Sequence, residues 1–119
     1  MKVAVSAQGP TLSDEIDPRF GRAAYFIIFD TENDEVEVLN NSVNANGFKG
    51  AGIQAATLMN DKGVNVLLTG YCGPKAFKVL EAGGVKVAGN ITGSISRAIT
   101  KLQAGYVSFE NGPNAEAHW

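Results

Sequence analysis

The sequence contains few residues that bind metals or form disulfides. Among its 119 residues there is one cysteine and one histidine. Two such residues cannot build a disulfide framework, a zinc finger, a CxxC redox pair or a metal site that needs several thiolate or imidazole ligands from one chain. A site that assembles its metal from free ions is therefore excluded, whereas a site that holds a finished cluster without covalent ligands is not.

The sequence also lacks long apolar runs and a large excess of either charge. Hydrophobic residues make up 45% of the chain, enough for an ordinary core, but their runs are too short and too interrupted to span a bilayer. The net charge is -2 and the 10 basic residues are scattered, which argues against tight binding to a nucleic-acid backbone. The apolar stretch at the amino terminus is too short for a signal peptide. We expect one cytoplasmic domain over residues 1–119, with no nucleic-acid or membrane partner.

Apolar patterning and turn residues predict the element order β-β-β-α-β-α-β-α. This order indicates an α/β fold, a five-stranded mixed sheet with helices on its faces. The charged and apolar alternation at residues 35–39 predicts a strand at the edge of the sheet. The Asn- and Gly-rich residues 40–50 are expected to form a loop, and residues 110–119 a mobile tail. The remaining strands are expected at residues 3–7, 25–29, 64–68 and 85–88, and the helices at 51–62, 74–82 and 95–104.

The strongest candidate site is the glycine-rich turn between the strand at residues 64–68 and the helix that begins at Pro74. Gly70 and Gly73 let the backbone approach a ligand closely, and the start of the helix offers N–H groups and partial positive charge to an anion. The same field would favour the thiolate of Cys72, as suits a metal ligand or a reactive thiol. The alternative is a tight strand-to-helix turn in which Cys72 is a small buried residue. The turn alone favours this alternative.

A second candidate site is the loop at residues 17–23, in which Arg19 and Arg22 flank Phe20 and Gly21. Two guanidinium groups there can donate hydrogen bonds to an anionic oxygen or sulfur. Lys49, at the end of the Asn-rich loop, either joins them or only keeps that loop soluble. The alternative for the two arginines is ion pairing with neighbouring carboxylates (Asp14, Glu15, Asp17).

Two further features carry little weight. The glycine pattern at residues 50–55 matches a short dinucleotide-binding fingerprint, but a polar loop precedes it where that fingerprint needs a strand. His118, alone in the tail, has no evident nucleophile to pair with.

Three blocks of sequence, at residues 17–23, 50–52 and 69–87, together resemble the dinitrogenase iron–molybdenum cofactor-binding family. That family includes nitrogenase cofactor carriers and the orange protein of sulfate reducers, whose stand-alone size this chain shares. The resemblance implies a ribonuclease H-like fold and non-covalent binding of a preassembled metal–sulfur cluster, by a carrier or store and not by an enzyme. The orange-protein branch implies an anionic molybdenum–copper sulfide cluster, with an iron–molybdenum–sulfur cluster as the alternative. Carriers of the nitrogenase cofactor often have a histidine before Phe-Gly-Arg, where this chain has Arg19.

The residue patterns and the resemblance together define a set of expected cluster-binding residues. Cys72 is the one possible direct metal ligand among them, and the two aromatic members suit polarisable sulfides. The set is Arg19, Phe20, Gly21, Arg22, Lys49, Gly70, Tyr71, Cys72, Gly73 and Lys75.

Two other functions are alternatives to cluster binding. A two-metal nuclease, which a ribonuclease H-like fold raises, needs carboxylates at strand ends, and the strands at residues 3–7 and 64–69 have none. The other is a protein-interaction or regulatory module that works without a cofactor, with an ATPase or a cofactor-assembly protein as its partner.

Overall fold

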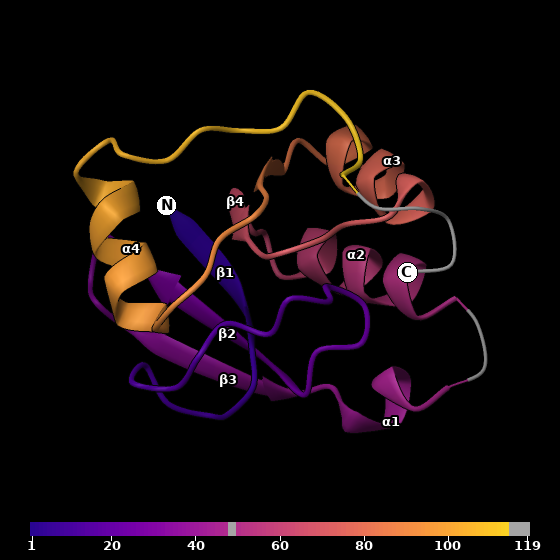
Figure 1. The fold of residues 1–119 in the computed structure, drawn as a ribbon, viewed down its shortest axis with the longest axis horizontal. Coiled ribbons are helices and arrows are strands. Elements are labelled where there is room, and N and C mark those ends of the chain that lie inside the picture. Colours follow the sequence, from indigo (N-terminus) through magenta and orange to yellow (C-terminus); the bar gives the residue numbers. More distant parts are fainter. Residues whose placement is uncertain (48–49, 115–119) are drawn as a thin grey trace.

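One mixed β-sheet organises the chain (Figure 1). The structure is a computed structural model that describes residues 1–47 and 50–114. Its strands lie in the order β3-β2-β1-β4-β5, with β1 antiparallel to β2 and parallel to β4. β3 pairs antiparallel with β2, and β5 pairs parallel with β4. The strands are β1 (Lys2–Ala7), β2 (Tyr25–Asp30), β3 (Val36–Asn40), β4 (Val66–Leu68) and β5 (Lys86–Ala88).

This topology confirms the predicted ribonuclease H-like α/β fold. β3 lies at an edge, as its alternation of charged and apolar residues predicted. β1 lies in the centre because both of its faces are apolar: Val3, Ala4 and Val5 are all completely buried. A strand with two apolar faces is stable only where other elements cover both of them.

The helices cover the two faces of the sheet unequally. One hydrophobic cluster joins Ala4 of β1 to Met59 and Phe77, which lie on α2 and α3, whereas another joins Val5 to Ile95 on α4. Figure 1 shows α2 and α3 side by side, with α4 on the other side of the sheet. The helices are α1 (Ser42–Ala45), α2 (Ala51–Asp61), α3 (Pro74–Ala82) and α4 (Ile95–Gln103).

The helix boundaries follow local signals in the sequence. Pro74 occupies the first turn of α3, where its missing N–H costs no hydrogen bond. Ser94 caps α4, because its Oγ accepts a hydrogen bond of 3.3 Å from the backbone N–H of Arg97. Three residues of α3 at helical spacing, Ala76, Phe77 and Leu80, are buried.

The prediction of a loop at residues 40–50 was wrong in one part, because α1 lies there. This helix has four residues and none of them is buried. It therefore has no apolar stripe that a periodicity argument could detect. Polar contacts from other segments hold it instead, as described below.

The chain after α4 returns across the sheet towards α3 (Figure 1). The N–H of Glu110 donates to the carbonyl of Val87 in β5 at 2.7 Å, and Asn114 bonds to the loop after β4. Glu110 and Asn114 of the expected tail are therefore hydrogen-bonded to the rest of the chain. Lys49, His118 and the rest of residues 115–119 lie outside the described residues. None of the described helices is long and apolar enough to cross a membrane.

Candidate functional site

The two loops that carry the predicted site residues lie side by side at the carboxyl ends of β1 and β4. The N–H of Phe20 donates to the carbonyl of Tyr71 at 3.1 Å, and the N–H of Tyr71 donates to the carbonyl of Pro18 at 2.6 Å. This pairing forms a parallel bridge that sets Arg19 beside Tyr71. Loops at the carboxyl ends of parallel strands are the usual place for ligands in sheets of this kind.

Gly70 and Gly21 allow the protein backbone itself to pack closely. A Cβ atom on Gly70 would lie 2.5 Å from the carbonyl oxygen of Pro18, and one on Gly21 would lie 2.5 Å from the backbone nitrogen of Gly52 in α2. Real Cβ atoms do not approach other atoms so closely. The close approach that the sequence suggested for a ligand is, at these two positions, an approach between segments of this chain.

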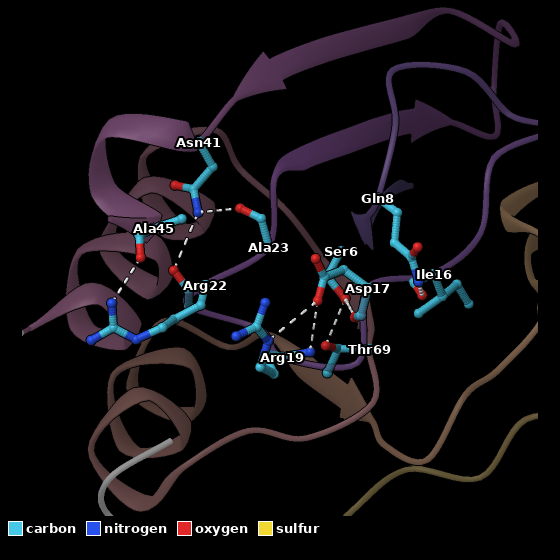
Figure 2. A network of polar contacts seen from close by, with 11 residues as sticks. Ser6, Gln8, Ile16, Asp17, Arg19, Arg22, Ala23, Asn41, Ala45 and Thr69 are labelled. Carbon is cyan, nitrogen blue, oxygen red and sulfur yellow. Dashed lines mark hydrogen bonds and ion pairs between the residues drawn. The ribbon is translucent and has the colours of Figure 1, made fainter. Parts of the chain in front are cut away.

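A buried polar network fixes the start of both loops (Figure 2). The Ser6 hydroxyl donates to the carbonyl of Asp17 at 2.7 Å, and its oxygen lies 2.7 Å from the hydroxyl oxygen of Thr69. In return, the N–H of Asp17 donates to the carbonyl of Ser6 at 2.9 Å. Sequence reasoning missed Ser6 and Thr69, although each is a polar residue that follows a run of apolar residues in or just after a strand.

Arg19 extends from this network towards solvent. Its side chain is 50% exposed, and its Nε lies 3.9 Å from the Asp17 carboxylate. The same carboxylate accepts a bond of 3.1 Å from the backbone N–H of Arg19. The predicted ion pair with Asp17 is thus present, but a long, half-exposed pair of this kind is weak. The guanidinium can still turn to a ligand.

Arg22 binds the chain rather than facing solvent. Figure 2 shows its guanidinium against α1. The Nη1 atom donates hydrogen bonds to the carbonyl oxygens of Ala45 at 2.7 Å and Gly47 at 2.9 Å. These carbonyls end a helix, where four C=O groups have no partner within the helix. Arg22 therefore holds the carboxyl end of α1 and Gly47 just after it.

Asn41 ties the start of α1 to the same loop as Arg22. Its amide nitrogen donates to the carbonyls of Gly21 at 3.2 Å and Ala23 at 2.8 Å. The side chain is buried, so these bonds replace water that it has lost. Residues 21–23 and α1 therefore form one hydrogen-bonded unit.

Phe20 is a core residue. Its side chain is 2% exposed, and its ring centroid lies 5.4 Å from that of Phe26. It packs in the same cluster as Met59 of α2. The predicted contact between Phe20 and a cluster is therefore not available in this conformation, whereas Tyr71 keeps 39% of its surface exposed.

The Cys72 side chain lies in the interior of the protein. Cys72 is 1% exposed, and burial raises the pKa of its thiol to about 12. The loss of hydration therefore outweighs the stabilising field of the nearby helix start. The thiol is protonated at neutral pH, and the alternative interpretation, a small buried residue in a tight turn, describes it as it stands.

The start of α3 presents positive charge beside Tyr71. Gly73 precedes the helix in an extended conformation and no side chain of the described residues caps it, while Lys75 in the first turn is exposed. A cavity of about 390 Å³ adjoins this turn. It is lined by Pro74, Lys75, Phe77, Lys78, Glu81, Asn111, Gly112 and Pro113.

Over residues 1–47 and 50–114, no group of three or more His, Cys, Asp or Glu side chains is placed to hold a metal ion. The exposed charged groups of the two motifs, Arg19 and Lys75, are cations, whereas the Asp17 carboxylate beside Arg19 is buried. The arrangement is therefore suited to an anion.

These features define an α/β protein of ribonuclease H-like topology with a basic loop surface at the carboxyl edge of its sheet. Residues 1–105 match the family model described as dinitrogenase iron-molybdenum cofactor, and the chain belongs to that family.

The similarity to known proteins covers most of the length of this chain. The structure of the apo form of the orange protein from Desulfovibrio gigas is 42% identical, covers 96% of both chains and superposes with a TM-score of 0.92. An NMR structure of a Thermotoga protein is 36% identical, covers 91% of both chains and has a TM-score of 0.77. A protein of Methanocaldococcus jannaschii is 34% identical over 102 residues, 83% of this chain and 82% of the relative.

Proposed function

We propose that this protein binds a preassembled, anionic metal–sulfur cluster without covalent ligands, as a cytoplasmic carrier or store and not as an enzyme. The observation that carries the proposal is the pairing of residues 18–20 with Tyr71, which brings Arg19 to the start of α3. The similarity to the apo orange protein supports a molybdenum–copper sulfide cluster as the cargo. The family description supports an iron–molybdenum–sulfur cluster as the alternative.

The donors at this surface fit an anionic cluster. Arg19 supplies planar N–H donors, Lys75 supplies a mobile ammonium group, and the start of α3 supplies backbone N–H groups with partial positive charge. None of these groups must lose a proton to act, so the site needs no thiolate. Sulfide ligands already present on the cluster take the place of protein thiolates around its metals.

Anaerobic reconstitution tests the proposal directly. Apo-protein is incubated with tetrathiomolybdate and Cu(I), passed through a gel-filtration column, and analysed for metal and visible absorbance. We expect coloured protein with metal equivalent to about one cluster per chain. Only trace metal after the column would refute cluster binding.

Removing the two exposed cations of the site should weaken cluster retention. We expect Arg19→Ala together with Lys75→Ala to release the cluster at least about tenfold faster, because charge-assisted hydrogen bonds to the anion are lost. Arg97→Ala with Lys101→Ala is the matched control, since it removes the same charge from exposed positions of α4. If both double variants release the cluster equally fast, general charge and not this surface retains it.

The same retention assay distinguishes the contribution of Arg22 from that of Cys72. We expect Arg22→Ala to weaken retention more than Cys72→Ser, because Arg22 holds α1 against the site whereas the Cys72 thiol is protonated and buried. Full retention by Arg22→Ala with complete loss in Cys72→Ser would show instead that thiolate ligation governs binding.

A second candidate function is a protein-interaction module that works without a cofactor, with an ATPase or a cofactor-assembly protein as partner. Exposed apolar side chains on the edge strand β3 favour it: Val36 and Val38 are 45% and 42% exposed. Affinity capture of the same partner by apo-protein and by an Arg19→Ala, Arg22→Ala variant would support this function over cluster binding.

A further inference from the structure

Asn114 makes three hydrogen bonds to the loop after β4. Its side-chain oxygen accepts from the N–H of Cys72 at 2.8 Å, and its side-chain nitrogen donates to the carbonyl of Gly70 at 2.9 Å. Its own backbone N–H donates to the carbonyl of Cys72 at 3.2 Å. One residue therefore pairs with the backbone on both sides of Tyr71, from a position more than forty residues further along the chain.

The segment that carries Asn114 is held on its way to the loop. The N–H of Glu110 donates to Val87 in β5, and the side chains of Glu110 and Asn114 both lie against the backbone of Gly89. A methyl group on Gly89 would overlap the Asn114 amide. The carboxyl-terminal segment thus covers the ends of β4 and β5 before it reaches the site.

The loop around Tyr71 is held from two directions. Pro18 and Phe20 bond to the N–H and the carbonyl of Tyr71 itself, and Asn114 bonds to the residues before and after it. An amide side chain supplies the acceptor and the donor on two adjacent atoms, whereas a carboxylate would only accept and an ammonium would only donate. The position therefore has a specific chemical requirement, which local sequence patterns do not reveal.

From this geometry we infer that Asn114 is a positioning residue of the candidate site. It fixes the loop that carries Tyr71 in the shape that receives the anion, and so slows release of a bound cluster. The inference rests on the proposed function, and it adds the carboxyl-terminal segment to the parts of the chain that build the site.

Amide hydrogen exchange on apo-protein, followed by NMR, tests whether Asn114 holds the loop around Tyr71, and it needs no cluster. We expect the Cys72 amide to exchange at least about tenfold faster in Asn114→Ala than in the wild type, because its acceptor is gone. Gly89→Ala, which keeps Asn114 but displaces it, should give the same result. The Met59 amide in α2 should keep its wild-type rate in both variants, because the core is intact.

Asn33→Ala is the matched control. Asn33 also accepts a backbone hydrogen bond, from the N–H of Glu35 at 3.0 Å, but it lies in the turn at the opposite end of the sheet. This variant should leave Cys72 exchange unchanged. Unchanged Cys72 exchange in Asn114→Ala, or an equal rise at Met59, would overturn the inference.

Release of a reconstituted molybdenum–copper sulfide cluster gives the functional readout. We expect Asn114→Ala and Gly89→Ala to lose the absorbance of the bound cluster several-fold faster than the wild type, and Asn33→Ala to match the wild type. Equal release from all four proteins would overturn the positioning role. If Cys72 exchanges faster in Asn114→Ala but the wild type takes up no cluster, the proposed function is refuted. The role of Asn114 in holding the loop around Tyr71 is then still supported.

Discussion

We expect Phe20→Ala to lower the free energy of unfolding by about 3–5 kcal/mol. The ring is 2% exposed and packs against Phe26 between the sheet and α2. Removing it takes apolar surface out of the core and leaves a cavity that the neighbours cannot fill. Urea denaturation of the wild type and of Phe20→Ala measures the difference in their free energies of unfolding.

Further substitutions test whether Phe20 is a core residue or a residue that contacts the cluster. Phe20→Leu should recover most of the stability and retain the cluster, because only apolar volume is required. Phe109→Ala, which removes a ring that is 40% exposed, should cost far less. A Phe20→Ala protein of wild-type stability that no longer holds a cluster would show that the ring contacts the cargo and not the core.

The second large effect is a loss of stability in alkaline solution caused by Cys72. Burial raises the pKa of its thiol to about 12, from an unfolded value of about 9. The folded state therefore holds the proton more tightly than the unfolded state does. This contribution is fully present below about pH 9 and is lost as the pH rises towards 12, by about 1.4 kcal/mol per pH unit.

Comparison with Cys72→Ala isolates this contribution from that of other titrating groups. Unfolding free energies measured in urea between pH 7 and pH 10.5 should converge for the two proteins, because only the wild type loses stability through the thiol. Parallel curves would mean that the thiol is hydrated in the folded state. Thiol reagents should also label the folded wild type slowly at pH 8, where an exposed cysteine reacts readily.

The fold was predictable where one residue pattern dominates a segment. β3 alternates charged and apolar residues, so its edge position could be assigned from the sequence. α3 begins at a proline and carries three buried residues at helical spacing. α1 has no such pattern, because polar bonds from Arg22 and Asn41 hold it, and these bonds join segments that are distant in the sequence.

The candidate site was predictable in its loops but not in the role of each residue. The motifs at residues 17–23 and 69–75 do meet, and Arg19, Tyr71 and Lys75 are exposed there. Phe20 and Cys72 are buried instead, because their loops pack on the core and not only on each other. Burial of a small residue after a strand depends on which neighbour covers it, and local sequence does not contain that information.

The order of the strands also sets when the site can form during synthesis. β1 leaves the ribosome with its antiparallel neighbours β2 and β3, but its parallel partner β4 follows much later: Val3 pairs with Val66. Until then, one edge of the central strand stays open to chaperones or to wrong partners. The loop after β4 cannot form its hydrogen bonds to Asn114 until that residue, which follows the five strands in the sequence, has been synthesised. Under the proposed function, a cluster can reach the complete site only after Asn114 has been synthesised.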